Sequence, residues 1–167
     1  MQIRSLIGIS LMIIVLLMAY MYAQQRNNLE LTFQDRAEIR ELLWTNHTGF
    51  DFANRDAASL WSSTFTPDAV LQNGNTVKTG EQEIRQYARD YFKNDPQRKI
   101  RHWTSTFHIT PTAEGAMLSA FWYIMTQEGD KKGLTLGSAG RYESHVIKTT
   151  NGWRIKKHHG FHDGPIM

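Results

Sequence analysis

Histidine and carboxylate side chains are the groups in this sequence best suited to chemistry. A histidine titrates near neutral pH, so it can take up or release a proton under working conditions. His47 precedes Asp51 by four residues, which places the two on the same face of a regular helix, where they could pair. The alternatives are an ordinary surface histidine for His47 and a solvent-exposed residue or turn cap for Asp51.

A second group of such residues lies near the C-terminus, where His158, His159, His162 and Asp163 are close in sequence. Histidine and carboxylate ligands could together hold a metal ion. A metal site needs fixed geometry, however, and Gly160 loosens a segment with no predicted helix or turn to hold the ligands. We therefore expect no metal here, and proton-transfer chemistry needs no cofactor.

The composition narrows the classes of function. The chain has 167 residues, of which 41% are hydrophobic and 21% charged, as is typical of a folded globular protein. It contains no cysteine, which excludes disulfide scaffolds, cysteine-zinc sites, iron–sulfur clusters and thiol nucleophiles. The net charge of +3 is too small and too scattered to indicate a nucleic-acid partner.

The N-terminal part of the chain is predicted to be a targeting or anchoring segment. Residues 5–23 carry no charge and follow Arg4, and one helix of that length would rise about 28 Å, close to the thickness of a bilayer core. The basic flank predicts a cytoplasmic N-terminus and an exported remainder, periplasmic or secreted. Both an uncleaved anchor and a signal peptide cut after Ala23 stay open, although Met21 is large for a cleavage site. We place a polar linker at the end of residues 1–29 and a folded domain at residues 30–167.

The hydrophobic pattern predicts helices first and a sheet last, which is an α+β fold. Helical spacing covers three segments: residues 33–54, 57–63 and 79–92. A turn at residues 65–68 and a hairpin around Asn73-Gly74 fall between the second and third helices. Four strands joined by short turns follow as an antiparallel meander, at residues 100–110, 116–127, 136–148 and 153–159. A long curved sheet folded against helices leaves a cone with a cavity.

The order of these elements and several short motifs resemble the SnoaL-like branch of the nuclear transport factor 2-like superfamily, which includes scytalone dehydratase, bile-acid dehydratase and ketosteroid isomerase. The motifs are AEIRELL at 37–43, FTPDA at 65–69, Gly80 with Ile84, Arg101-His102, GRYE at 140–143 and NGWRI at 151–155. The resemblance implies a cone-shaped α+β barrel, with three N-terminal helices packed on a strongly curved, mainly antiparallel sheet. It does not fix a reaction, because this fold also serves as a plain binding module.

The resemblance implies a catalytic pair. The family's dehydratases use an acid late in the first helix and a histidine on the first long strand, and these positions fall on Asp51 and His102. His102 would act as general base and acid, and Asp51 would orient its ring or serve as a second base. The alternative for His102 is an inward histidine satisfied by a backbone group. The dehydratases carry a tyrosine five residues before the acid, where this chain has Asn46, which can donate a hydrogen bond but cannot act as an acid.

Alternation along the strands suggests further contacts with a substrate. If His102 faces the cavity, Trp103 faces outward toward an interface, unless a bulge reverses the alternation part-way along the strand. Tyr123 could present its phenol to a ligand or be a packed aromatic residue. Arg141 could hold a carboxylate or enolate oxygen, or pair with Glu143.

The sequence and the resemblance together predict an exported enzyme that performs proton-transfer chemistry on a small, largely apolar molecule. The family often has an arginine near the position of His158, which implies a cation at the cavity mouth there. Catalysis is assigned to His102 and Asp51, and substrate binding to Asn46, His47, Tyr123, Arg141 and His158. The alternatives are a non-catalytic binding module and a membrane-tethered, dimerising accessory domain. Analogy with the fold suggests a homodimer.

Overall fold

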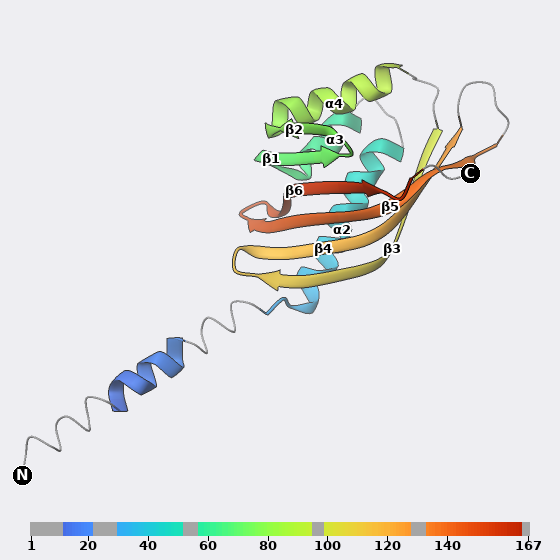
Figure 1. Ribbon diagram of the computed structural model, residues 1–167. Coiled ribbons are helices and arrows are strands. Elements are labelled where there is room, and N and C mark those ends of the chain that lie inside the picture. The colour runs from blue at the N-terminus through green and yellow to red at the C-terminus, as the bar shows by residue number, and fades with distance from the viewer. Residues whose placement is uncertain (1–11, 22–29, 52–56, 95–98, 128–132, 165–167) are drawn as a thin grey trace, which may run out of the picture. The chain divides into compact units, whose positions relative to one another are not determined.

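The structure is a computed structural model that describes residues 12–21, 30–51, 57–94, 99–127 and 133–164 (Figure 1). The chain divides into two compact units, Met1–Glu30 and Leu31–Met167. In the first unit residues 12–21 are helical, and the rest of the predicted segment 5–23 lies outside the described residues. Among the residues described, no helix combines the length and the apolar character that crossing a membrane requires.

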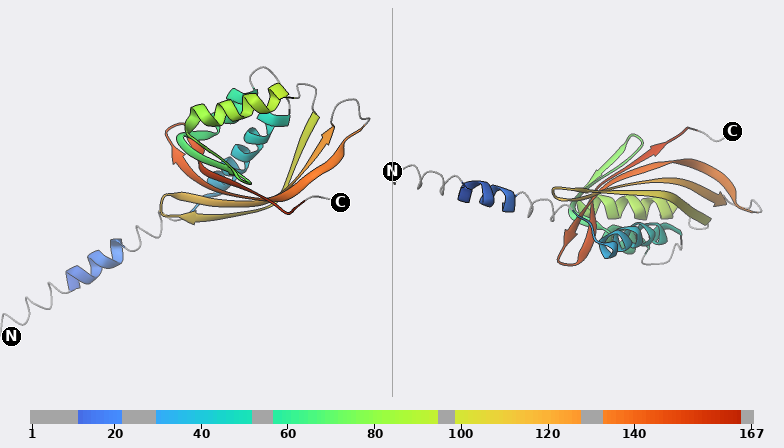
Figure 2. Two further views of the ribbon diagram at one scale, coloured as in Figure 1. Left: turned by 45° about the horizontal axis from the view of Figure 1, so that its top comes forward. Right: turned by 90° about the horizontal axis from the view of Figure 1, so that it is seen from below.

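The second unit is an α+β fold in which helices line the inner side of a curved sheet (Figure 2). Its helices are α2 (Phe33–Asp51), α3 (Ala57–Ser63) and α4 (Gly80–Asn94). Its strands are β1 (Phe65–Asn73), β2 (Thr76–Thr79), β3 (Lys99–Thr112), β4 (Gly115–Gln127), β5 (Thr135–Thr149) and β6 (Gly152–His162).

The strands form one six-stranded sheet in the described part of the chain, in the order β2-β1-β6-β5-β4-β3. Only the pairing of β1 with β6 is parallel among these strand pairs, and β3 to β6 form the expected meander. Strands β2 and β3 are the open edges, so the sheet curls without closing. The predicted fold class is confirmed, and the face that carries the helices is called the concave face below.

The core fills the space between the helices and the concave face. Its fully buried side chains come from every layer, and the largest are Ile39, Leu43, Ile84, Leu118, Val146 and Ile155. Burial of such aliphatic side chains stabilises a fold by about 1.5–3 kcal/mol each. This core fixes α2 and α4 against the sheet and thereby positions the side chains that project from them.

The start of α2 is fixed by a capping box that also reaches the sheet. The Asp35 amide donates to Thr32 Oγ1 (3.0 Å), and Asp35 Oδ2 accepts from the Thr32 amide (3.1 Å). Asp35 Oδ1 further accepts from Lys148 Nζ (2.7 Å) and Trp153 Nε1 (3.2 Å). These donors, Lys148 first, hold the pKa of Asp35 far below its usual range. The network joins the first turn of α2 to β5 and β6.

The predicted turn at residues 65–68 is wrong, because this segment begins β1. Phe65 lies opposite Ile155 of β6, and the Ile155 amide donates to the Thr64 carbonyl (2.9 Å). Pro67 gave the turn signal, but a register shift between Phe65 and Val70 accommodates a residue that has no N–H to donate. The predicted hairpin is confirmed, with Gly74 at φ +56°.

A bulge divides β3 into two parts that face opposite ways. The register with β4 shifts between Ser105 and His108, and Thr106 has φ +56°. Ile100 is buried before the bulge and Ile109 is buried after it, although they are an odd number of residues apart. The bulge therefore lets His102 and the later core residues of β3 all face the helices.

Candidate functional site

Asp51 and His102 are in contact where the end of α2 meets β3. His102 Nδ1 lies 2.6 Å from Asp51 Oδ1, and the side chains are 10% and 13% exposed. The His102 backbone N–H also donates to Asp51 Oδ2 (3.0 Å), and Arg101 donates to the Asp51 carbonyl (2.9 Å). A carboxylate at Nδ1 favours the tautomer in which Nε2 can accept a proton, and it stabilises the imidazolium that results.

His47 lies beside this pair and does not take the place of His102. Its ring stacks on that of His102, with centroids 4.8 Å apart and planes at 14°. Its Nδ1 bonds to Thr104 Oγ1 (3.0 Å), so the expected alternative pairing of His47 with Asp51 is not found. His47 is buried rather than a surface residue, and burial lowers its pKa well below the ordinary value. Within the described residues its Nε2 has no hydrogen-bond partner.

A row of rings continues from His47 into a pocket. Tyr142 on β5 lies 5.5 Å from the ring of His47 and 4.8 Å from that of His158. Burial raises the pKa of Tyr142 far above its ordinary value, and the charge of Asp51 adds to the effect. Tyr142 is thus neutral, and its ring contacts both His47 and the pocket-lining His158.

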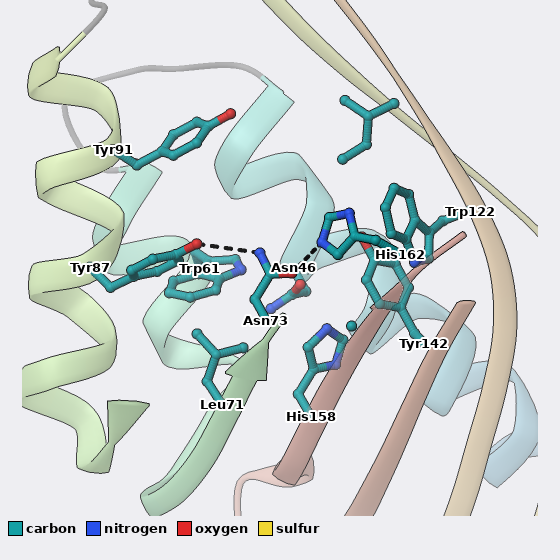
Figure 3. Close-up of a pocket in the computed structure, with 12 residues that line it drawn as sticks. Asn46, Trp61, Leu71, Asn73, Tyr87, Tyr91, Trp122, Tyr142, His158 and His162 are labelled. Carbon is teal, nitrogen blue, oxygen red and sulfur yellow. Dashed lines mark hydrogen bonds between the residues drawn. The ribbon is translucent and has the colours of Figure 1, made fainter. Parts of the chain in front are cut away.

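The pocket lies on the concave face, with about 590 Å³ not filled by protein atoms and part of that open to solvent (Figure 3). Aromatic rings dominate its lining: Trp61, Tyr87, Tyr91, Trp122, Tyr142, His158 and His162, together with Asn46, Leu71, Asn73, Ile124 and Gly160. Ile124 is the register partner of His102 on β4. Because register partners point to the same side of a sheet, His102 is on the face that builds the pocket. The described lining residues do not include His102, Asp51 or His47, so the pair lies beside the pocket.

The amides of the pocket already have partners. Asn46 donates to Thr64 Oγ1 (2.8 Å), which fixes the residue that stands where the dehydratases have tyrosine. Asn73 donates to the Tyr87 hydroxyl (3.3 Å) and accepts from His162 Nε2 (2.7 Å) (Figure 3). In the part of the chain that the structure describes, no cluster of three or more His, Asp or Glu could hold a metal ion.

His158 lines the pocket as predicted, but it is not a cation. Its Nδ1 bonds to Ser144 Oγ (2.8 Å), and both side chains are buried. Burial lowers the pKa of His158 to about 4, with a smaller contribution from His159. The imidazole is therefore neutral at physiological pH.

Tyr123 and Arg141 lie on the convex face, away from the pocket, and their predicted contacts with a substrate are corrected. Tyr123 is 41% exposed and stacks on Trp103, with ring centroids 6.0 Å apart. Arg141 pairs with Glu143 (3.3 Å) and lies over the Phe161 ring at 4.1 Å. The ion pair is the alternative that the sequence left open for Arg141.

Sequence reasoning missed most of the aromatic lining. On β4, Trp122 and Ile124 face the pocket. Both alternating sets of side chains on that strand are apolar, so the sequence did not indicate which set faces the helices. On α4 a usable signal existed, because Ile84, Tyr87 and Tyr91 follow helical spacing and share the inner side.

The chain belongs to the SnoaL-like domain family, whose profile matches residues 31–159. Its fold is the α+β cone of the nuclear transport factor 2-like superfamily. Comparison with curated proteins finds no match.

Several solved structures share the fold at low sequence identity. One, described as a candidate aromatic ring hydroxylase from Novosphingobium aromaticivorans, has a TM-score of 0.71 and 22% identity and covers 83% of this chain and 95% of its own. Another from the same organism is described as a candidate scytalone dehydratase. It has a TM-score of 0.67 and 14% identity, and the match covers 78% of this chain and 85% of the other. A third is from Catenulispora acidiphila, in complex with S-DNPA. It has a TM-score of 0.67 and 18% identity, and the match covers 77% of this chain and 92% of the other.

Proposed function

We propose that this protein is a small-molecule enzyme that performs cofactor-free proton transfer, in a dehydration, isomerisation or hydrolysis, on a largely apolar substrate. The observation that carries the proposal is the 2.6 Å contact between His102 Nδ1 and Asp51 Oδ1 on the face that builds an aromatic pocket. A histidine that is oriented by a carboxylate, on the sheet face that also builds such a pocket, is suited to act as a general base. The bound ligand in the structure from Catenulispora acidiphila supports a binding role for this fold.

The chemistry follows from the tautomer of His102. Nε2 takes a proton from a carbon next to a carbonyl group, and the electron pair of the broken C–H bond moves into an enolate. Asp51 stabilises the resulting imidazolium. The imidazolium then returns the proton, either to another carbon, which isomerises the substrate, or to a leaving hydroxyl, which releases water. The aromatic rings of the pocket reduce the access of competing water to the enolate.

The proposal includes export and a dimer. Residues 5–23, without charge and preceded by Arg4, support export of the folded domain, whether they are cleaved or remain as an anchor. Exposed aromatic side chains on the convex face support a homodimer; they are Trp103, Phe121 and Tyr123. The same patch is the observation that favours an accessory, dimerising domain as the second candidate function.

Exchange of substrate protons with solvent tests the enzymatic proposal. The full chain is incubated in D2O with a panel of bicyclic ketones and β-hydroxy ketones, and deuterium uptake and loss of water are followed by NMR and mass spectrometry. We expect His102→Ala to slow exchange by about 10²–10⁴-fold, the usual contribution of a general base. His108→Ala is the matched control, because His108 is exposed on the same strand beyond the bulge. Equal rates for the wild type and His102→Ala, or no exchange with any compound, would leave the binding-module alternative in place.

A further inference from the structure

His158 is clamped at the pocket wall in one orientation. Its ring lies 4.8 Å from that of Tyr142 and 6.3 Å from that of Phe65, whose plane is nearly perpendicular to it. Nδ1 is held by Ser144 Oγ at 2.8 Å, and Ser144 has no solvent exposure. Figure 3 shows the ring pointing from β6 into the pocket. Because the ring is already held in one orientation, it loses little conformational entropy when a ligand binds to it.

The bond to Ser144 assigns the tautomer of His158. Among the described residues, His158 Nδ1 is the recorded hydrogen-bond partner of the Ser144 hydroxyl, and a fully buried hydroxyl proton needs an acceptor. The hydroxyl therefore donates to Nδ1, which leaves the ring proton on Nε2. Nε2 is at the end of the ring remote from the strand, so the N–H group is the one presented to the pocket.

Among the residues described, the pocket around this N–H group has no side chain with a permanent charge. The lining residues that the structure describes include no Lys, Arg, Asp or Glu, and burial keeps His158 neutral by lowering its pKa to about 4. Arg141, the cation expected to receive a carboxylate or enolate oxygen, pairs with Glu143 on the convex face instead. A carboxylate in this pocket would lose its hydration without gaining a counter-charge, which is costly. The uncharged oxygen of a carbonyl or hydroxyl group, by contrast, needs only one hydrogen-bond donor to replace its contact with water.

We propose that His158 Nε2–H donates a hydrogen bond to an uncharged oxygen, a carbonyl or hydroxyl, of the substrate and makes the pocket select uncharged oxygenated molecules over carboxylates. The inference rests on the proposed function in taking this pocket as the substrate site. In catalysis, a neutral donor on a carbonyl oxygen also stabilises the enolate that develops as the proton leaves.

Three probes of similar shape test the selection: 1-tetralone, its hydrocarbon tetralin, and 1-naphthoate. Their dissociation constants are measured with the full chain from the change in tryptophan fluorescence, to which Trp61 and Trp122 in the pocket lining contribute. We expect the wild type to bind 1-tetralone about 3–10-fold more tightly than tetralin, which corresponds to one net hydrogen bond. It should bind 1-naphthoate more weakly than either.

The variants separate the donor from the shape of the ring. His158→Phe should bring the 1-tetralone to tetralin ratio close to one, and His158→Gln, which keeps a donor, should retain part of it. His159→Phe is the control, because His159 is the neighbour on β6 that stacks on Phe161 instead of lining the pocket. A second readout uses the wild type alone: 1-tetralone should shift the His158 Nε2–H resonance in nitrogen-15 NMR.

An unchanged ratio in folded His158→Phe would overturn the proposal. So would tighter binding of 1-naphthoate than of 1-tetralone, or no effect of millimolar 1-tetralone on the His158 resonance. His102→Ala should keep the preference for 1-tetralone, since the preference does not depend on the base. If His102→Ala loses deuterium exchange but keeps the preference for 1-tetralone, both the proposed function and the role of His158 stand. If the wild type exchanges deuterium normally but shows no preference for 1-tetralone, only the role of His158 is contradicted.

Discussion

Three histidines lie close together at the site, and their surroundings differ. His102 has a carboxylate at hydrogen-bond distance from its Nδ1. His47 and His158 are buried, and the hydrogen bonds that the structure records for them are with hydroxyls. Burial lowers the pKa of both. We therefore propose proton transfer for His102, and we propose positioning and binding roles for the two neutral histidines.

This difference predicts a loss of stability in acid. His158 has a pKa of about 4 in the folded state against 6.5 as its ordinary value, so between these values the unfolded chain binds the proton and the folded chain does not. The free energy of unfolding therefore falls as the pH is lowered from 6.5 to 4, by about 3 kcal/mol from His158 alone. The depressed pKa of His47 acts in the same direction. Asp35 contributes only at lower pH, below its ordinary pKa of 3.8.

Urea unfolding at a series of pH values between 7 and 4.5 measures this slope. His158→Phe should flatten it, since phenylalanine takes up no proton in either state. His159→Phe should leave it close to that of the wild type. Identical slopes for wild type and His158→Phe would show that His158 is not held neutral by the fold.

At the scale of elements, the bulge in β3 decides which side chains reach the site. Without the extra residue, a strand that points His102 toward the helices would point Ile109 toward solvent. Thr106 lies in the bulge that reverses the side-chain alternation of β3, and its φ is +56°. This conformation costs a β-branched residue about 1–2 kcal/mol. Strain of this kind next to a site is a common feature of bulges that aim a side chain.

Glycine at the bulge should relieve the strain. We expect Thr106→Gly to raise the free energy of unfolding by about 0.5–1 kcal/mol, after subtraction of the entropy that glycine gains in the unfolded chain. Thr110→Gly, at an exposed threonine in the regular part of the same strand, should lower it by a similar amount. Urea titration compares the two, and a destabilised Thr106→Gly would contradict the account of the bulge. Exchange activity should persist in Thr106→Gly, because the direction of His102 is kept.

The sequence predicted the elements well, because caps, turns and hydrophobic period are local signals. The helix at Ala57–Ser63 and the four-stranded meander are examples. The contact of Asp51 with His102 was reached only through a resemblance, since residues so distant in sequence carry no local sign of proximity. Tyr123 was misplaced because β4 is apolar on both faces. Arg141 was misplaced because alternation along β5 does not show which set of side chains faces the helices. The charge of His158 was misjudged because burial is a property of the folded chain.

At the scale of the whole molecule, the convex face carries an aromatic patch that a monomer would leave in water. Trp103 and Phe121 are 54% and 55% exposed, and Trp103 stacks on Tyr123 of the neighbouring strand. Arg141 over Phe161 continues the patch across β5 and β6. Contiguous exposed aromatic groups on a sheet favour self-association, which is the basis of the proposed homodimer.

Charge reversal on this patch tests the dimer. The wild type should sediment at twice the chain mass of 19.3 kDa in a density-matched detergent, and Trp103→Glu with Phe121→Glu should sediment as a monomer with an unchanged circular dichroism spectrum. Trp44→Glu is the matched control, because Trp44 is 57% exposed on α2. Dissociation by Trp44→Glu but not by the convex-face variant would place the interface on the helices.

We propose that Asp51 and His102 act as one unit in proton transfer, and a double-variant cycle in the deuterium-exchange assay measures the coupling between them. Wild type, Asp51→Asn, His102→Gln and the double variant are compared with the same ketone. If Asp51 works through His102, the double variant is no slower than His102→Gln alone, because the carboxylate has nothing left to orient. Independent, multiplying losses from the two substitutions, or four equal rates, would contradict the account.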